Sequence, residues 1–268
     1  MRDVNNPIEP VSPYKSAPGF FNIAHRGASY YAPENTMPAF KLAVEMNADM
    51  IELDITLTRD GIPVVFHDQK LDRTTNGTGN IQHFLSRELG ELDAGLWLNK
   101  EFTGTRIPTL ENVLEWASGT IALNIEIKKE AILKSIKPGI AEITCELVEQ
   151  FGMTDQVVIS SFSDEALIKS RNASPKIPTA HLINPYSWGS KRNLKLMKKL
   201  GAVGLNLKHR QMRSRLMKQA ELDKYPVWVY TVDDKEEMKK VIEKGATGIF
   251  TNRPDVLSKV ASSVLVER

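Results

Sequence analysis

The chain has 268 residues, of which 41% are hydrophobic and 25% charged, as is ordinary for a globular protein of one large or two small domains. Its 35 basic and 33 acidic residues leave a formal charge of +2, which argues against binding nucleic acid or a membrane through bulk charge. The single cysteine, Cys145, excludes a disulfide framework and a cysteine metal cluster, and we expect it to be buried as a small apolar residue.

Residues 1–19 form a polar arm that is rich in proline. The arm lacks the basic stretch and apolar core of a signal peptide, and no apolar run in the chain is long enough to span a bilayer. We therefore expect a cytoplasmic protein without stable membrane insertion, in which residues 20–268 form a single domain. The sequence does not indicate an oligomeric state.

From residue 20 onward, short apolar runs alternate with longer amphipathic stretches, a pattern typical of a parallel sheet covered by helices. The predicted strands are residues 20–24, 50–56, 64–67, 121–127, 157–160, 179–183, 203–207, 227–232 and 248–251. The predicted helices are residues 37–46, 110–117, 136–151, 163–172, 191–200, 213–223 and 235–244. At this length and number of repeats we predict an α/β fold, a closed (β/α)8 barrel of the TIM type.

Two stretches make the predicted barrel irregular. Nine candidate strands compete for eight places, and Asp60-Gly61 is a turn signal that favours a hairpin before residues 64–67, so one strand is expected outside the barrel or at an irregular point of it. Residues 69–105, called the insertion below, are rich in turn residues and break the alternation. We predict that the insertion packs as a small subdomain beside the active-site face.

The predicted strand 50–56 carries two carboxylates on one face. Its strict alternation directs Glu52 and Asp54 to one side, while the apolar side chains between them point to the other. The alternative is a solvent-facing strand edge, but both faces of the sheet in an α/β protein are usually covered. Two buried carboxylates side by side repel each other unless a cation neutralises them.

The predicted strand 121–127 repeats this pattern, because Glu126 shares a face with Asn124 and Lys128. An internal ion pair between Glu126 and Lys128 is the alternative to a functional site. With Glu52 and Asp54, Glu126 completes a set of three carboxylates from two strands. Such an all-oxygen set suits Mg²⁺ or Ca²⁺ rather than zinc.

Two histidines follow apolar runs at the ends of predicted strands. His25 precedes Arg26, whose forked guanidinium suits phosphate oxygens, and Gly27, which lets the backbone approach closely. His67 precedes Asp68, which is either a turn residue or a group that orients a histidine. One such histidine alone is often structural, but two among carboxylates indicate an acid/base pair. The histidines to which we assign no chemical role are His83, His181 and His209.

Taken together, these motifs resemble those of the glycerophosphodiester phosphodiesterases. The matching segments are His25-Arg26-Gly27, Pro33-Glu34-Asn35-Thr36, Glu52-Leu53-Asp54, Val65-Phe66-His67-Asp68, Glu126-Ile127-Lys128, Ser160-Ser161-Phe162, residues 227–232 and residues 248–255. The order and spacing of five separate motifs make the resemblance specific, and it covers about residues 20–257. The family is a (β/α)8 barrel with an insertion after the strand that carries the second histidine.

The resemblance implies hydrolysis of glycerophosphodiesters to an alcohol and glycerol 3-phosphate. It implies a divalent cation, Mg²⁺ or Ca²⁺, held by Glu52, Asp54 and Glu126. It assigns acid/base roles to His25 and His67. It implies that Arg26 and Lys128 contact the phosphate and that Trp228 lines the pocket. For the attacking group we expect the glycerol 2-hydroxyl, which would form a cyclic phosphate, because an internal hydroxyl has a high effective molarity.

One departure from the family pattern is Asn252, where many members carry Asp. The amide keeps its hydrogen-bonding capacity, but one charge is missing if the position matters electrostatically. Two other functions share most of these motifs. A phospholipase of similar barrel design would act on lysophospholipids, as a lysophospholipase D does, or on phosphoinositides. A non-catalytic binding module would keep only the fold, but the presence of both histidines and all three carboxylates argues against it.

Overall fold

A computed structural model of the chain describes residues 19–133, 136–184, 186 and 190–266. Eight parallel strands form a closed barrel in the order β1-β9-β8-β7-β6-β5-β4-β2, and the pairing of β1 with β2 completes the circle. The described strands are β1 (Phe21–His25), β2 (Met50–Leu57), β3 (Pro63–Val65), β4 (Ala122–Ile127), β5 (Val157–Ser161), β6 (Thr179–Leu182), β7 (Gly204–Lys208), β8 (Val227–Tyr230) and β9 (Gly248–Thr251). The predicted (β/α)8 barrel is confirmed.

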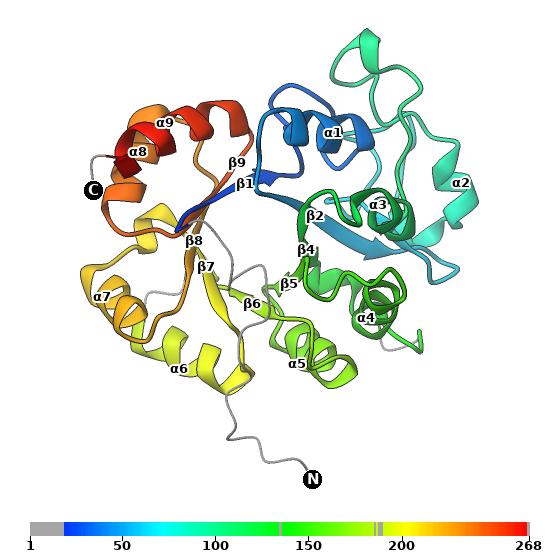
Figure 1. The fold of residues 1–268 in the computed structure, drawn as a ribbon. Coiled ribbons are helices and arrows are strands. Elements are labelled where there is room, and N and C mark those ends of the chain that lie inside the picture. Colours follow the sequence, from blue (N-terminus) through cyan, green and yellow to red (C-terminus); the bar gives the residue numbers. More distant parts are fainter. Residues whose placement is uncertain (1–18, 134–135, 185, 187–189, 267–268) are drawn as a thin grey trace.

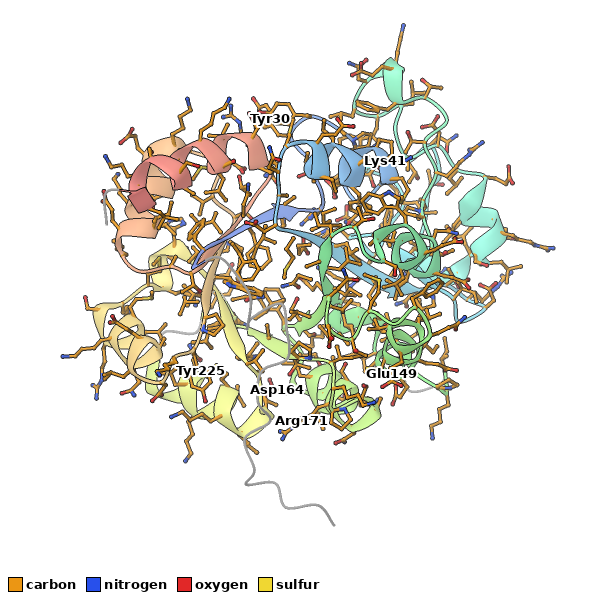
Figure 2. All side chains as sticks on the ribbon, viewed as in Figure 1. Tyr30, Lys41, Glu149, Asp164, Arg171 and Tyr225 are labelled. Atoms are coloured by element: carbon orange, nitrogen blue, oxygen red, sulfur yellow. The ribbon has the colours of Figure 1, made fainter. Side chains whose placement is uncertain are left out.

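The helices form a ring around the barrel (Figure 1). They are α1 (Met37–Glu45), α3 (Leu110–Ala117), α4 (Ile140–Gln150), α5 (Asp164–Ala173), α6 (Ser190–Leu200), α7 (Ser214–Leu222), α8 (Lys235–Glu243) and α9 (Pro254–Val266), while the short helix α2 (Ser86–Gly90) belongs to the insertion and lies outside the ring. Short 3-10 turns cover Ile81–His83, Lys100–Phe102, Lys129–Ala131 and His209–Gln211. Figure 2 shows Glu149 and Arg171 on the outer helices, where Arg171 Nη1 donates to the carbonyl of Leu200 at the end of α6 at 3.2 Å.

The ninth strand lies outside the barrel, as the count of candidate strands indicated. β3 pairs antiparallel with β2, with Ile55 opposite Val65, and the predicted turn at Asp60-Gly61 joins them. Gly61 adopts a φ of 78°, a left-handed conformation that glycine tolerates without strain. β2 therefore continues past the barrel mouth and returns as a hairpin, which brings residue 67 back toward the barrel.

Alternation along the strands separates two kinds of buried side chain. The outward-facing residues of β2 and β4, among them Leu53 and Ile125, pack under the helices in one large apolar cluster. A smaller cluster fills the barrel interior and includes Phe21, Met50 and Trp228. The barrel is thus packed at its centre, and its polar inward-facing residues gather toward the carboxyl ends of the strands.

Two details differ from the sequence prediction, and a third agrees with it. α4 begins at Ile140 and not at residue 136, because Pro138 disfavours a helical residue before it and Gly139 occupies the N-cap. α9 is absent from the helices predicted above. Cys145 is buried on α4, as expected, and its Sγ lies 3.4 Å from the carbonyl of Ser170.

The insertion leaves the barrel between β3 and α3 and projects outside the ring of helices (Figure 1). It has a small apolar cluster shared with the hairpin strand, which includes Leu71, Ile81, Leu89 and Val64. This cluster supports the prediction that the insertion packs as a small subdomain. The division of the chain into a domain and this subdomain remains a prediction. Among the described residues no helix is both long and apolar enough to cross a bilayer.

Candidate active site

Three carboxylates meet at the carboxyl ends of β2 and β4. The strand register places Asp54 opposite Glu126, and Glu52 lies one inward-facing position below. Their side chains each offer one oxygen within 4.8 Å of the others. The residues are only 3% (Glu52), 1% (Asp54) and 9% (Glu126) exposed, so the alternative of a solvent-facing strand edge is wrong.

The three carboxylates of this cluster repel one another when they are ionised. Burial and then the charge of Asp54 raise the pKa of Glu126 to about 7, and the same two causes raise the pKa of Glu52 well above its usual range. Burial would also raise the pKa of Asp54, but the charges of Lys128 and Arg26 outweigh it and hold this pKa well below its usual range. The cluster thus contains one stable carboxylate and two that are costly to ionise.

Two cationic side chains partly neutralise the carboxylates. Lys128 Nζ lies 3.0 Å from Glu126 Oε1 and 3.3 Å from Asp54 Oδ1. Arg26 Nε lies 3.3 Å from Asp54 Oδ2. The ion pair that was the alternative interpretation of Glu126 and Lys128 is therefore present, but as one contact of a larger cluster. Three carboxylates against two cations leave one negative charge when all are ionised, and this all-oxygen set fits a divalent cation.

The loop after β1 brings Arg26 to the cluster. Arg26 and Gly27 both have left-handed backbones, with φ of 58° and 81°. A Cβ on Gly27 would lie 2.7 Å from the backbone of Ala39 in α1, so only glycine allows this close approach. The tight turn also directs the Arg26 backbone N–H to Glu52 Oε2 at 2.9 Å.

His25 ends β1 beside Glu52, with Nε2 at 4.0 Å from Glu52 Oε2. Its Nδ1 lies 2.7 Å from Asn252 Oδ1. Desolvation and then the charge of Arg26 lower the pKa of His25 to about 4. The ring is therefore neutral near pH 7 and can accept a proton at one of its nitrogens. Asn252, where a charge was expected to be missing, contacts a predicted catalytic residue directly.

His67 reaches the site from the hairpin and not from the end of a barrel strand. Phe66 donates its backbone N–H to the carbonyl of Asp54 at 2.9 Å, which holds the residue before His67 against β2, and His67 is among the groups that lower the pKa of Asp54. His67 Nδ1 lies 2.6 Å from Asp68 Oδ1. Of the two interpretations of Asp68, this contact favours the group that orients a histidine.

A chain of ion pairs connects the two sides of the site. Arg73, from the insertion, donates from Nε to Asp68 at 2.6 Å and from both terminal nitrogens to Glu34 at 2.7 and 2.8 Å. Glu34 also accepts from Arg26 Nη1 at 2.8 Å. Burial would raise the pKa of Asp68, but Arg73 and His67 outweigh it and lower this pKa. Arg73 and Glu34 are site residues to which the sequence interpretation assigned no role.

Two further polar residues were missed. Asn35 donates to Asp54 Oδ2 at 2.9 Å and accepts from the Asp54 backbone at 3.2 Å, which fixes this carboxylate. Asp233 accepts from Asn252 at two points. Asn35 lies in a motif that carried the resemblance, so a signal existed. Asp233 had none, because it precedes Asp234, the N-cap of α8, and two aspartates before a helix resemble capping alone.

Trp228 lies deeper than a pocket-lining residue would. It is 1% exposed and packs edge-on against Phe21, with ring centroids 5.4 Å apart. The inward-facing residue nearer the mouth is Tyr230, whose pKa is raised by burial and then by the charge of Glu126. Its ring also contacts Phe162 edge-on, with centroids 6.1 Å apart. The role of Trp228 in substrate binding therefore remains a prediction.

The three other histidines lie on elements other than the strands that carry the carboxylates. His83 belongs to the insertion, and His209 begins the turn that follows β7. His181 on β6 is buried, and its pKa is lowered by that burial.

At the rim of the molecule, Tyr30 lies between α1 and α9 (Figure 2), with the guanidinium of Arg253 4.8 Å from its ring centroid. This contact ties the loop after β1 to the start of α9.

Comparison with known proteins gives one consistent result. A model of the glycerophosphoryl diester phosphodiesterase family matches residues 25–256. A glycerophosphodiester phosphodiesterase of Caldanaerobacter subterraneus is 37% identical over 236 residues, covering 88% of this chain and 95% of the relative. One from Bacillus subtilis is 34% identical over 255 residues, covering 89% and 85%.

Solved structures agree with the sequence relatives. A glycerophosphodiester phosphodiesterase of Agrobacterium tumefaciens superposes with a TM-score of 0.77 at 30% identity, covering 88% of this chain and 98% of the other. A phosphodiesterase of Oleispira antarctica, solved in complex with the product sn-glycerol-3-phosphate, superposes with a TM-score of 0.78 at 28% identity, covering 90% and 96%.

Proposed function

This chain belongs to the glycerophosphoryl diester phosphodiesterase family, and from that premise we propose that it hydrolyses glycerophosphodiesters to an alcohol and glycerol 3-phosphate with a divalent cation. It is a phosphoric diester hydrolase. The observation that carries the proposal is the buried cluster of Glu52, Asp54 and Glu126, whose oxygens lie within 4.8 Å of one another beside two histidines. A cytoplasmic location remains a prediction from the sequence.

Glu52, Asp54 and Glu126 would hold Mg²⁺ or Ca²⁺. The raised pKa values of Glu52 and Glu126 support this assignment, because a cation removes the repulsion that burial intensifies. When bound, such a cation polarises the phosphoryl oxygen and neutralises its charge. Asn35 would keep Asp54 in one orientation throughout.

Arg26 and Lys128 would bind the non-bridging phosphate oxygens. Both are already held at the cluster by Asp54, so their charges are aimed at one place before substrate arrives. As charge builds on the phosphoryl group, each can shift part of its hydrogen bonding from carboxylate to phosphate. Trp228 would form the apolar floor of the interior below the substrate.

His25 and His67 would move the protons. Each ring has one nitrogen engaged by a polar side chain, Asn252 or Asp68, which leaves the other nitrogen for substrate. One histidine takes the proton from the glycerol 2-hydroxyl as that oxygen attacks phosphorus, and the other protonates the leaving alkoxide. Water then opens the five-membered cyclic phosphate while the two histidines exchange roles.

A second candidate, lysophospholipase D-like or phosphoinositide phospholipase activity, is favoured by one feature of the insertion. Three consecutive apolar residues, Leu96, Trp97 and Leu98, are exposed there. Such a patch could contact the acyl chain of a lysophospholipid.

One experiment separates these possibilities, namely ³¹P NMR of the products from three substrates with Mg²⁺ or Ca²⁺ present. We expect glycerol 3-phosphate from glycerophosphocholine, and very little product from its 2-deoxy analogue, which lacks the attacking hydroxyl. Faster turnover of lysophosphatidylcholine would favour the second candidate. Normal turnover of the 2-deoxy analogue would rule out the cyclic phosphate.

A further inference from the structure

Asp233 follows β8 and holds two residues at the end of β9, the next strand around the barrel. Its Oδ1 accepts from the Asn252 backbone N–H at 2.7 Å and from Thr251 Oγ1 at 2.9 Å. Its Oδ2 accepts from Asn252 Nδ2 at 2.6 Å. Three hydrogen bonds to one carboxylate therefore fix both the backbone and the side-chain amide at position 252.

The carboxylate of Asp233 determines the orientation of the side-chain amide of Asn252. Turned over, the amide would bring its oxygen to 2.6 Å from Asp233 Oδ2, and two acceptors would face each other. In the observed orientation Oδ1 points to His25 Nδ1 at 2.7 Å and accepts from Ser29 Oγ at 2.8 Å. An amide oxygen can only accept, so His25 Nδ1 carries the hydrogen.

A neutral histidine with hydrogen on Nδ1 has a lone pair on Nε2. In His25, Nε2 is the nitrogen on the side of Glu52, at 4.0 Å from Oε2. We propose that Asp233, acting through Asn252, is a positioning residue that holds His25 in the tautomer with an unprotonated Nε2 facing the carboxylate cluster. The proposal rests on the function proposed above only in one respect, that the lone pair of Nε2 accepts a proton during hydrolysis.

The relay differs from that of the second histidine. Asp68 contacts His67 directly, whereas a neutral amide separates Asp233 from His25. The amide transmits orientation without placing a formal charge against the ring. Asp233 can control the tautomer of His25 only if Asn252 Nδ2 keeps donating its hydrogen bond to Asp233. Substitution of Asp233 tests this requirement.

Asp233→Asn is the first test. The amide oxygen introduced at position 233 would still accept from the backbone N–H of Asn252, so its NH2 group would face Asn252 Nδ2. Two donors would then face each other, and the side-chain amide of Asn252 would flip. His25 Nδ1 would then face a donor and the hydrogen would move to Nε2. We expect kcat for glycerophosphocholine with Mg²⁺ to fall by about 10²-fold, with KM changed much less.

The exchanged double variant, Asp233→Asn with Asn252→Asp, is the second test. Here the amide introduced at position 233 donates to the carboxylate introduced at position 252, which accepts from His25 Nδ1, so every hydrogen bond of the relay is restored. We expect kcat to recover at least about tenfold over the single variant. Asp49→Asn is the matched control, because Asp49 Oδ2 accepts from the Asn22 backbone at 2.7 Å, and we expect wild-type kcat from it.

A readout independent of activity is the ¹⁵N NMR spectrum of histidine-labelled full-length protein with Mg²⁺, with His25 assigned from a His25→Gln sample. We expect hydrogen on Nδ1 of His25 in the wild type and the exchanged variant, and on Nε2 in Asp233→Asn. Hydrogen on Nδ1 in Asp233→Asn, or no recovery of kcat in a folded exchanged variant, would overturn the proposal. A wild type inactive on glycerophosphodiesters would refute the proposed function, while the spectra would still decide the role of Asp233.

Discussion

Among the single residues of the site, Glu126 is a carboxylate whose ionisation is made unfavourable by its neighbours and its burial. Burial and the charge of Asp54 raise its pKa from 4.5 to about 7, while Lys128 at 3.0 Å opposes the shift. Below about pH 7, the folded protein without metal therefore holds Glu126 mainly protonated. A cation removes this preference, so the same carboxylate weakens the metal-free protein and strengthens the metal-bound one.

The stability of the metal-free protein should depend on pH through this residue. Between pH 4.5 and about 7, Glu126 is ionised in the unfolded chain and protonated in the folded one, so stability falls as the pH rises. Glu126→Gln has no proton to lose. We expect its melting temperature in EDTA to exceed that of the wild type by at least about 2 °C at pH 8, and the difference to shrink at pH 5.

Differential scanning calorimetry at the two pH values checks this expectation. Addition of CaCl2 provides the internal control, because it should raise the melting temperature of the wild type more than that of Glu126→Gln. A variant less stable than the wild type at pH 8 without metal would contradict the account of Glu126.

The sequence allowed prediction of those site residues that lie on regular strands. Period-two alternation predicts the shared face of Glu52 and Asp54 without knowledge of the fold. Arg73 and Asp233 could not be found in this way, because each acts from an irregular segment through partners far away in the chain. Which residues the loops hydrogen-bond depends on the tertiary arrangement, and a local sequence pattern does not reveal that arrangement.

At the scale of elements, the β2–β3 hairpin is the main departure from a regular barrel. The turn signal at Asp60-Gly61 predicted it, but the position of His67 followed only from the antiparallel register of β3. The sequence interpretation had treated both histidines as equivalent strand ends. The hairpin instead brings His67 in beside the insertion. Arg73 of the insertion therefore contacts Asp68, the partner of His67, and reaches the side of His25 only through Glu34 and Arg26.

Arg73 is the contact through which the insertion should act. Arg73→Ala removes the bonds to Asp68 and Glu34 together, and we expect kcat to fall about tenfold because Asp68 loses its second partner. The side chain is nearly half exposed, so the loss in unfolding free energy should stay within about 1 kcal/mol. Steady-state kinetics and thermal melting measure the two effects.

Arg59→Ala is a matched control for this prediction. Arg59 also pairs with a residue of the insertion, Glu88, but the pair is exposed and 3.9 Å long. We expect wild-type kcat from this variant. Equal kcat in Arg73→Ala and Arg59→Ala would show that the insertion does not act through Arg73.

At the scale of the whole molecule, the closed barrel explains why residues distant in the chain share one site. The carboxyl ends of β1, β2 and β4 are neighbours because β1 pairs with β2, and β2 pairs with β4. The next neighbour of β1 on the other side is β9, which brings Asn252 to His25. Alternating strands and helices predicted the barrel, whereas the pairing that closes it comes from the three-dimensional structure.

The central claim is that the carboxylate cluster binds a divalent cation required for phosphodiester hydrolysis. The rate of glycerol 3-phosphate release from glycerophosphocholine, measured after EDTA treatment and then during titration with Mg²⁺ or Ca²⁺, tests it most directly. We expect EDTA to abolish the rate, one of these ions to restore it saturably, and Asp54→Asn to stay inactive under the same titration. Full activity after removal of all metal, or a wild-type response from Asp54→Asn, would contradict it.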